Sequence, residues 1–203
     1  IKNNLNNVDK VFSIIPQNAK IIITNTVFQK IDKKKYKPLS NYGLSKTVSY
    51  EKMIELSKKY KIEYKSFFIP NPWGILEEKK LNYYLITNWL NKNKTEIKFP
   101  DYIRDNIFIN KLSEEYNNLL HLRSKQKEFF PSGYCSSNKV FIEALRKKFE
   151  KFFKIKTDVK YSLMTKTDQP LIRINGNKIQ KKIQYKENLD NYFKYYSRIV
   201  KNS

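Results

Sequence analysis

The sequence predicts an α/β fold, because helical and extended patterns alternate along the chain. A short apolar strand is expected at Ile21 to Ile23 in "AKIIITNTVFQ", and a second in "IEYKSFFIPNPWG". Apolar residues with helical spacing fill residues 43–60 between the two strands. Pro70, Pro72 and Gly74 end the second strand after Ile69. Helices alternating with strands are typical of α/β proteins.

Helical spacing also predicts the other helices. The first residues, "IKNNLNNVDKVFSII", place Leu5, Val8, Val11 and Phe12 on one side of a helix that is already under way at Ile1. Ser136 or Ser137 is expected to cap a helix that runs to residue 153. Further helices are expected over residues 79–92, 110–122 and 186–200, short extended pieces over 95–109, and a strand over 156–164.

Composition indicates one medium domain, or most of a larger one. The chain has 203 residues, of which 40% are hydrophobic, so it can bury a sizeable core. Its single cysteine, Cys135, allows no internal disulfide and fits a reducing, cytoplasmic setting. We find neither an apolar run near twenty residues nor a leader, so we expect no membrane span.

The net charge of +22 raises the possibility of a nucleic-acid partner. Of the 41 basic residues only five are arginines, whereas base-edge recognition relies on the bidentate guanidinium. The lysines are spread along the whole chain, which indicates a solvated surface, so a nucleic-acid partner is not expected. The only histidine, His121, has no evident metal partners in the sequence, and no metal site is predicted.

The segment "NYGLSK" contains a tyrosine and a lysine four residues apart, Tyr42 and Lys46. On a helix the two side chains share a face. An ammonium within about 4 to 6 Å favours the phenolate form of a tyrosine, which makes it a usable general acid or base. Spacing alone proves little, since the chain has 15 tyrosines and 36 lysines.

Four segments in order carry more information: "IIITNTVF", "NYGLSK", "FFIPNPWG" and "YIRDNIFI". Together they resemble the extended short-chain dehydrogenase/reductases, the NAD-dependent epimerase/dehydratase family that acts on nucleotide sugars. The resemblance implies the C-terminal part of a Rossmann-like, doubly wound parallel sheet plus a smaller mixed α/β substrate-binding region. Residues 1–70 would form the second half of an NAD(P)-binding domain, and residues 71–203 mainly the substrate-binding region, with some segments returning to the sheet.

The same resemblance implies catalytic roles for Thr24, Tyr42 and Lys46. Tyr42 would exchange the proton of a sugar hydroxyl while hydride passes to or from the nicotinamide of NAD or NADP. Lys46 would assist Tyr42 and hold the nicotinamide ribose, and Pro70 would lie beside the nicotinamide. Thr24 would hydrogen-bond the reacting oxygen. Thr26 is the alternative hydroxyl and a candidate substrate contact.

Asn71 and Arg104 match positions that bind the diphosphate of a nucleotide-sugar substrate in that family. The resemblance also implies a homodimer and a role in surface-glycan precursor synthesis. Asn25 follows Thr24 where the family's sugar 4,6-dehydratases carry an acidic residue, so epimerisation or ketone reduction is expected rather than dehydration. After Arg104, Asn110 and Lys111 stand where the family usually carries acidic residues.

One part of the family pattern is missing. The family holds its dinucleotide with a glycine-rich turn, and the four glycines of this chain, Gly43, Gly74, Gly133 and Gly176, are too far apart to form one. Aligned on the family, the sequence starts after the fourth strand, so we expect this polypeptide alone to bind NAD poorly. The alternative is a catalytically inactive relative with the same fold, acting as a binding module for nucleic acid or another anionic polymer.

Overall fold

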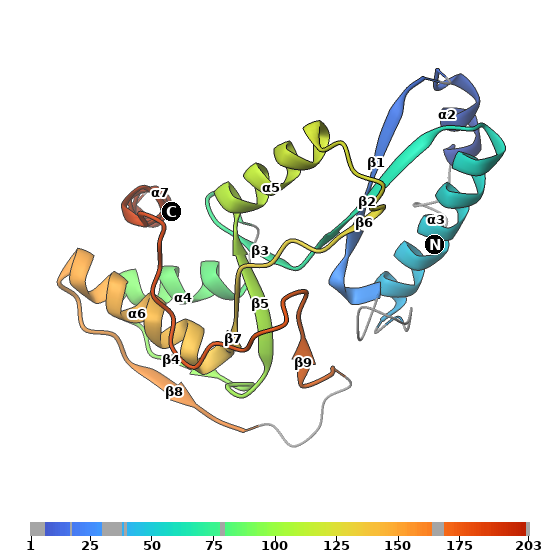
Figure 1. The fold of residues 1–203 in the computed structure, drawn as a ribbon. Coiled ribbons are helices and arrows are strands. Elements are labelled where there is room, and N and C mark those ends of the chain that lie inside the picture. The colour runs from blue at the N-terminus through green and yellow to red at the C-terminus, as the bar shows by residue number, and fades with distance from the viewer. Residues whose placement is uncertain are drawn as a thin grey trace.

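The computed structural model describes residues 7–16, 18–29, 38, 40–77, 80–163 and 169–201 (Figure 1). The predicted alternation of helices and strands is confirmed. The N-terminal elements are α2 (Val8–Ile14), β1 (Lys20–Thr26), the 3-10 turn η1 (Val27–Gln29), α3 (Asn41–Lys59) and β2 (Glu63–Ile69). The later elements are β3 (Asn71–Trp73), α4 (Leu81–Leu90), β4 (Thr95–Ile97), β5 (Ile103–Phe108), α5 (Ile109–His121), β6 (Glu128–Phe129), β7 (Tyr134–Ser137), α6 (Asn138–Phe153), β8 (Val159–Tyr161), β9 (Ile172–Arg173) and α7 (Asp190–Lys201).

The first sheet is parallel, with the strand order β1-β2-β6, and it lies between two helices. Successive side chains of a strand point to opposite faces. Phe67 packs with Leu112 and Leu119 of α5, whereas its neighbour Phe68 packs with Tyr50 of α3. Figure 1 shows α3 and α5 on opposite sides of β1 and β2. Since both faces are covered, strand β2 is apolar in consecutive positions, as expected for a parallel sheet inside a protein.

The second sheet is built around β5. Strand β7 pairs antiparallel with one edge of β5, and β3 and β9 pair parallel with the other edge, one after the other. The register places Asn71 opposite Asn106 and Arg173 opposite Arg104. The chain passes from β2 of the first sheet through one residue, Pro70, into β3 of the second, so the carboxyl end of the first sheet adjoins the second.

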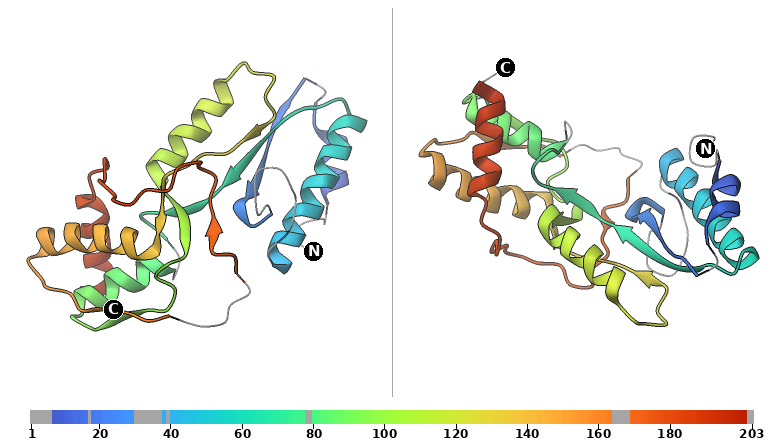
Figure 2. Two further views of the ribbon diagram at one scale, coloured as in Figure 1. Left: turned by 60° about the horizontal axis from the view of Figure 1, so that its bottom comes forward. Right: turned by 90° about the horizontal axis from the view of Figure 1, so that it is seen from above.

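The largest core lies beside the second sheet, between α4, α6 and α7 (Figure 2). Trp73, Trp89, Phe141 and Tyr192 are at most 2% exposed and belong to it. Each fully buried aromatic ring removes a large apolar area from water. This aromatic cluster holds α4 and β3 in place, and both elements contribute to the cavity described below.

Some expectations need correction. Val11 was expected on the buried side of the first helix but is 49% exposed, and Leu5 lies outside the described residues. Residues 134–137 form the antiparallel strand β7, which the sequence did not predict, while Ser137 caps α6 as expected by accepting a hydrogen bond from the Val140 backbone N–H at 3.3 Å. None of the described helices combines the length and the apolar composition needed to cross a membrane.

Candidate active site

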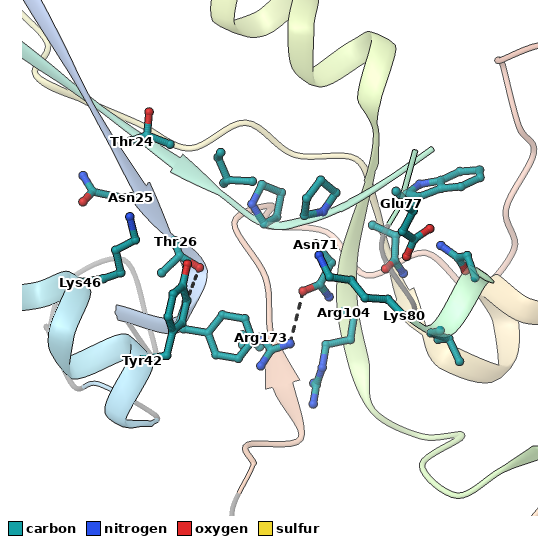
Figure 3. Close-up of a pocket in the computed structure, with 18 of the residues that line it drawn as sticks. Thr24, Asn25, Thr26, Tyr42, Lys46, Asn71, Glu77, Lys80, Arg104 and Arg173 are labelled. Carbon is teal, nitrogen blue, oxygen red and sulfur yellow. Dashed lines mark hydrogen bonds between the residues drawn. The ribbon is translucent and has the colours of Figure 1, made fainter. Parts of the chain in front are cut away.

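A cavity of about 640 Å³ lies where the two sheets meet (Figure 3). The ends of β1 and β2 form one wall, the first turns of α3 and α4 stand at its two ends, and β3, β5 and β9 complete it. All seven residues that the sequence assigned to catalysis, cofactor binding or substrate binding line this cavity: Thr24, Thr26, Tyr42, Lys46, Pro70, Asn71 and Arg104.

Helix α3 places Tyr42 and Lys46 at one end of the cavity. Its N-cap, Ser40, accepts a hydrogen bond from the Gly43 backbone N–H at 3.1 Å, which fixes the start of the helix. Tyr42 and Lys46 are one turn apart and therefore share a face. Tyr42 is 53% exposed, and no hydrogen bond of its hydroxyl is found within the part of the chain that the structure describes. A phenol and an ammonium thus stand free to contact a ligand.

The end of β1 brings only one of its two threonines to Tyr42. Thr26 is buried and lies beside the Tyr42 ring, whereas Thr24 is exposed, with its hydroxyl directed away from that ring (Figure 3). Side-chain alternation places Asn25 on the other face of the strand, toward Lys46. In this conformation Thr26, the alternative hydroxyl of the sequence analysis, is therefore the one adjacent to Tyr42.

Asn71 forms the middle of the cavity wall. It is the first residue of β3, directly after Pro70 at the end of β2. Its Oδ1 accepts a hydrogen bond from a guanidinium NH2 of Arg173 at 3.3 Å (Figure 3). This bond joins β3 to β9, the two short strands that share one edge of β5.

Arg104 is a buried residue, only 5% exposed, and not the surface ion pair that its residue type alone would suggest. One of its NH groups donates to the carbonyls of Ile103 at 2.9 Å and Leu171 at 3.0 Å. Its guanidinium carbon lies 4.5 Å from the centre of the Tyr102 ring. These contacts hold the side chain in place without supplying a negative charge.

Arg173 lines the cavity beside Arg104, and the sequence did not single it out. It is 6% exposed, and its Nε and Nη1 have no hydrogen-bond partner among the described residues, whereas its Nη2 donates to Asn71. Its guanidinium carbon lies 3.7 Å from the centre of the Phe28 ring. A usable signal was present, because arginine is rare in this chain and "PLIRIN" embeds one in an apolar segment.

The two arginines form a centre of uncompensated positive charge. They are register partners on β5 and β9, and no carboxylate in the described part of the chain forms an ion pair with either. Burial lowers the pKa of Arg104 to about 10, and burial together with the charge of Arg104 lowers the pKa of Arg173 to about 10. Buried charges are costly unless they are paired. The pair is therefore suited to an anionic ligand with several oxygens.

Glu77, Lys80 and Asn82 lie at the far end of the cavity, and no sequence motif pointed to them. Burial raises the pKa of Glu77 to about 7, although Lys80, the Asn82 side chain and the Gly74 backbone each favour its charged form. Glu77 Oε2 and Asn82 Oδ1 are buried without a partner in the described chain. Both are thus acceptors open to a donor on a ligand.

The four glycines of the chain all lie in tightly packed places. A Cβ added at any of the four would lie between 2.2 and 2.5 Å from another atom of the chain, so each glycine is packed against protein. None of them forms a cradle for a pyrophosphate. Tyr42, Lys46 and Pro70, the residues expected from the sequence to lie beside a nicotinamide and its ribose, do share one cavity. The described residues contain no group of three or more His, Cys, Asp or Glu residues that could hold a metal.

No known sequence family and no curated protein matches the chain. Solved structures do match. UDP-glucuronic acid 4-epimerase from Bacillus cereus, solved with UDP-4-deoxy-4-fluoro-glucuronic acid and NAD, aligns with a TM-score of 0.74 at 14% identity, over 97% of this chain and 68% of that one. UDP-glucose 4-epimerase from Thermotoga maritima, solved with UDP-glucose, gives 0.74 at 16% identity, over 98% and 70%.

The dTDP-glucose 4,6-dehydratase from Bacillus anthracis, solved with NAD, aligns with a TM-score of 0.65 at 16% identity, over 88% of this chain and 62% of that one. The chain has the fold of the extended short-chain dehydrogenase/reductases. The expected fold class is therefore confirmed. Within the extended short-chain dehydrogenase/reductase fold, the cavity lies at the carboxyl ends of parallel strands, where ligands bind in open α/β sheets.

Proposed function

We propose that this protein is an NAD(P)-dependent nucleotide-sugar epimerase or reductase. One observation supports the proposal most strongly: a single cavity joins a tyrosine and a lysine at one end to two buried guanidinium groups in its middle, neither of which has a carboxylate partner among the described residues. A ligand that suits both parts has an anionic diphosphate linked to a group that exchanges a proton. The relatives solved with UDP-sugars and NAD support the same substrate class.

Each end of the cavity has its own task in this proposal. NAD or NADP supplies hydride transfer when bound. Tyr42 takes the proton from a sugar hydroxyl, or returns it to the ketone oxygen, and Lys46, one turn further along α3, holds the nicotinamide ribose. Thr24 was the first candidate for a hydrogen bond to the reacting oxygen, and the position of Thr26 beside Tyr42 favours Thr26 for that contact.

Arg104 and Arg173 bind the diphosphate in this proposal. Charged hydrogen bonds to phosphate oxygens supply the negative charge that the two buried side chains lack. Asn71, which already contacts Arg173, lies where its amide can donate to an oxygen between the sugar and the phosphates. Tight, oriented binding of the nonreacting part of a substrate is what places the reacting carbon within reach of a general base.

The residues of β1 disfavour dehydration. Elimination of water from a sugar needs an acid next to the reacting carbon, and Asn25 and Thr26 carry no ionisable group. Asn25 is also 3% exposed, and its amide donates to the Ile23 carbonyl at 3.3 Å. Epimerisation or ketone reduction is therefore the proposed reaction, although one of the similar structures is a dehydratase.

Substitution of Tyr42 tests the proposed chemistry. Turnover of UDP-glucose, UDP-glucuronic acid, UDP-N-acetylglucosamine and dTDP-glucose is followed with NAD and with NADP, using the chain together with any residues its gene encodes before Ile1. Tyr42→Phe should lower the rate at least about 100-fold, the usual contribution of a positioned acid or base. Tyr84→Phe, an exposed tyrosine on α4, is the matched control and should have no effect. Full activity of Tyr42→Phe would contradict the assignment.

The high charge leaves a binding module as the second candidate. A protein with a net charge of +22 attracts any polyanion, so an inactive relative that binds nucleic acid would show affinity for duplex DNA without any sugar-nucleotide turnover. We propose in addition a cytoplasmic homodimer working in surface-glycan precursor synthesis. Sedimentation of the purified protein checks the dimer.

A further inference from the structure

Phe28 lies between the two working parts of the cavity. The Arg173 guanidinium carbon is 3.7 Å from the centre of the Phe28 ring, and the Tyr42 ring meets Phe28 edge-on, with centroids 5.9 Å apart and an interplanar angle of 83°. The three side chains come from β9, η1 and α3, segments that are far apart in the sequence. One aromatic ring therefore contacts both the anion-binding arginine and the tyrosine assigned to proton transfer.

The backbone fixes the position of this ring. The Phe28 N–H donates to Thr26 Oγ1 at 3.4 Å, and the Thr26 N–H donates to the Gln29 side chain at 2.8 Å, which closes the turn η1. Gly43, next to Tyr42, packs directly on this turn, since a Cβ there would lie 2.4 Å from the Phe28 carbonyl oxygen. The turn and the start of α3 are thus held together, and Phe28 cannot move far from Tyr42.

Arg173 is less firmly held by the backbone. Strand β9 has two residues, and the only described hydrogen bond of the guanidinium goes to Asn71 at 3.3 Å. The face of an aromatic ring attracts a guanidinium, most strongly where water is excluded, as it is for a side chain that is 6% exposed. The Phe28 ring is therefore a main determinant of where the Arg173 charge sits.

We propose that Phe28 is a positioning residue that couples anion binding at Arg173 to the placement of Tyr42. Binding of a diphosphate draws the Arg173 guanidinium toward its oxygens, and the Phe28 ring transmits this change to the edge of Tyr42. The inference rests on the proposed function, because it takes a diphosphate as the ligand of Arg173. It predicts that removing the aromatic face weakens diphosphate binding and also uncouples Tyr42 from it.

The test uses the 203-residue chain, with UDP as the probe. Calorimetry should show UDP binding about tenfold weaker in Phe28→Leu than in the unsubstituted chain, equal to about 1.4 kcal/mol. Phe28→Tyr keeps the aromatic face and should bind within about twofold of the unsubstituted chain. Phe130→Leu removes a ring that stacks on Phe68 away from the cavity and serves as the control, with no change in UDP affinity expected.

The second readout is the ring NMR signal of Tyr42, identified by its loss in Tyr42→Phe. Saturating UDP should shift this signal in the unsubstituted chain and in Phe28→Tyr, but not in Phe28→Leu. If Phe28→Leu does not fold, Arg173→Gln takes its place, and its Tyr42 signal should likewise not respond. The inference fails if Phe28→Leu or Arg173→Gln binds UDP as tightly as the unsubstituted chain and its Tyr42 signal shifts as much. That result would leave the proposed function untouched. Absence of UDP binding to the folded, unsubstituted chain overturns the proposed function as well.

Discussion

The Glu77 carboxylate is the titratable group in the cavity whose pKa shift has a consequence near neutral pH. Burial raises its pKa from 4.5 to about 7. Between about pH 4.5 and 7 the folded chain therefore holds a proton that the unfolded chain has released, so this group's contribution to stability is full below pH 4.5 and is lost as the pH rises through 7.

Glu77→Gln should remove that pH dependence. The loss in the free energy of unfolding between pH 5 and pH 8 is on the order of 2 kcal/mol in the unsubstituted chain and should be absent in the variant. Urea unfolding at the two pH values measures it. Glu51→Gln, an exposed glutamate on α3, should leave the slope unchanged. A slope that persists in Glu77→Gln would mean that other groups produce it.

Among single residues, those in recognisable segments could be predicted and those in irregular segments could not. Tyr42 lies in the first turn of α3, and Asn71 begins β3 just after the predicted end of a strand at Ile69, so their place in the chain already indicates which part of the fold they reach. Arg173 reaches the same cavity from a two-residue strand whose partner, Arg104, is far away in sequence. Which threonine Tyr42 meets was also beyond prediction, because Thr24 and Thr26 share one face of β1 and only the folded chain places the start of α3 beside Thr26.

The side chain of Lys65 connects strand β2 to helix α5, which covers one face of the sheet. The side chain is 9% exposed, and its Nζ donates to the carbonyls of Leu119, at 3.4 Å, and Leu122, at the C-terminal end of α5. Carbonyls in the last turn of a helix have no partners within the helix and carry its negative partial charge. A buried ammonium there satisfies both the hydrogen bonds and the charge.

Lys65→Met keeps much of the side-chain volume and removes the ammonium. It should lower the free energy of unfolding by about 2 kcal/mol, because the Leu119 carbonyl becomes buried without a donor. Lys20→Met on the neighbouring strand is the control: Lys20 forms an exposed ion pair with Glu63 at 3.2 Å, so its loss should cost less than about 0.5 kcal/mol. Equal effects of the two substitutions in thermal or urea unfolding would show that Lys65 does not secure α5.

At the level of elements, length decided what the sequence could predict. Helices α3, α5 and α6 have 19, 13 and 16 residues, and their apolar spacing located them to within a few residues. Strands β6, β7 and β9 have two to four residues, too few for a periodic pattern. Their positions depend on pairing with β2 and β5, which is a property of the folded chain and not of the segment.

The whole molecule places its cavity where the topology requires. Parallel strands β1 and β2 end at the same edge of their sheet, and Pro70 carries the chain from that edge into β3. Residues on separate segments therefore meet there, which explains why seven residues chosen from sequence motifs line one cavity. The net positive charge of the chain does not depend on this topology, because the lysines are spread along the whole sequence and belong to no single motif.

That charge should act on the rate of ligand association. A net charge of +22 attracts UDP from a distance, and salt screens the attraction over about 10 Å at 0.1 M ionic strength. We expect the association rate constant to fall about tenfold or more between 0.05 and 0.5 M KCl. The dissociation rate constant should change less than about threefold, since the proposed contacts of UDP to buried Arg104 and Arg173 are screened much less.

Stopped-flow tryptophan fluorescence provides the measurement, because Trp73, one of the two tryptophans, lines the cavity. Uridine, which carries no charge, is the control and should associate at a rate that salt barely changes. A short DNA duplex tests the alternative function under the same conditions. If UDP binds at 0.15 M KCl and binding of the duplex is no longer detected at 0.3 M KCl, the protein has a site for a small anion and the surrounding positive charge is incidental. Tighter binding of the duplex than of UDP at both concentrations would instead favour the binding module, because only a polyanion gains from many spread lysines at once.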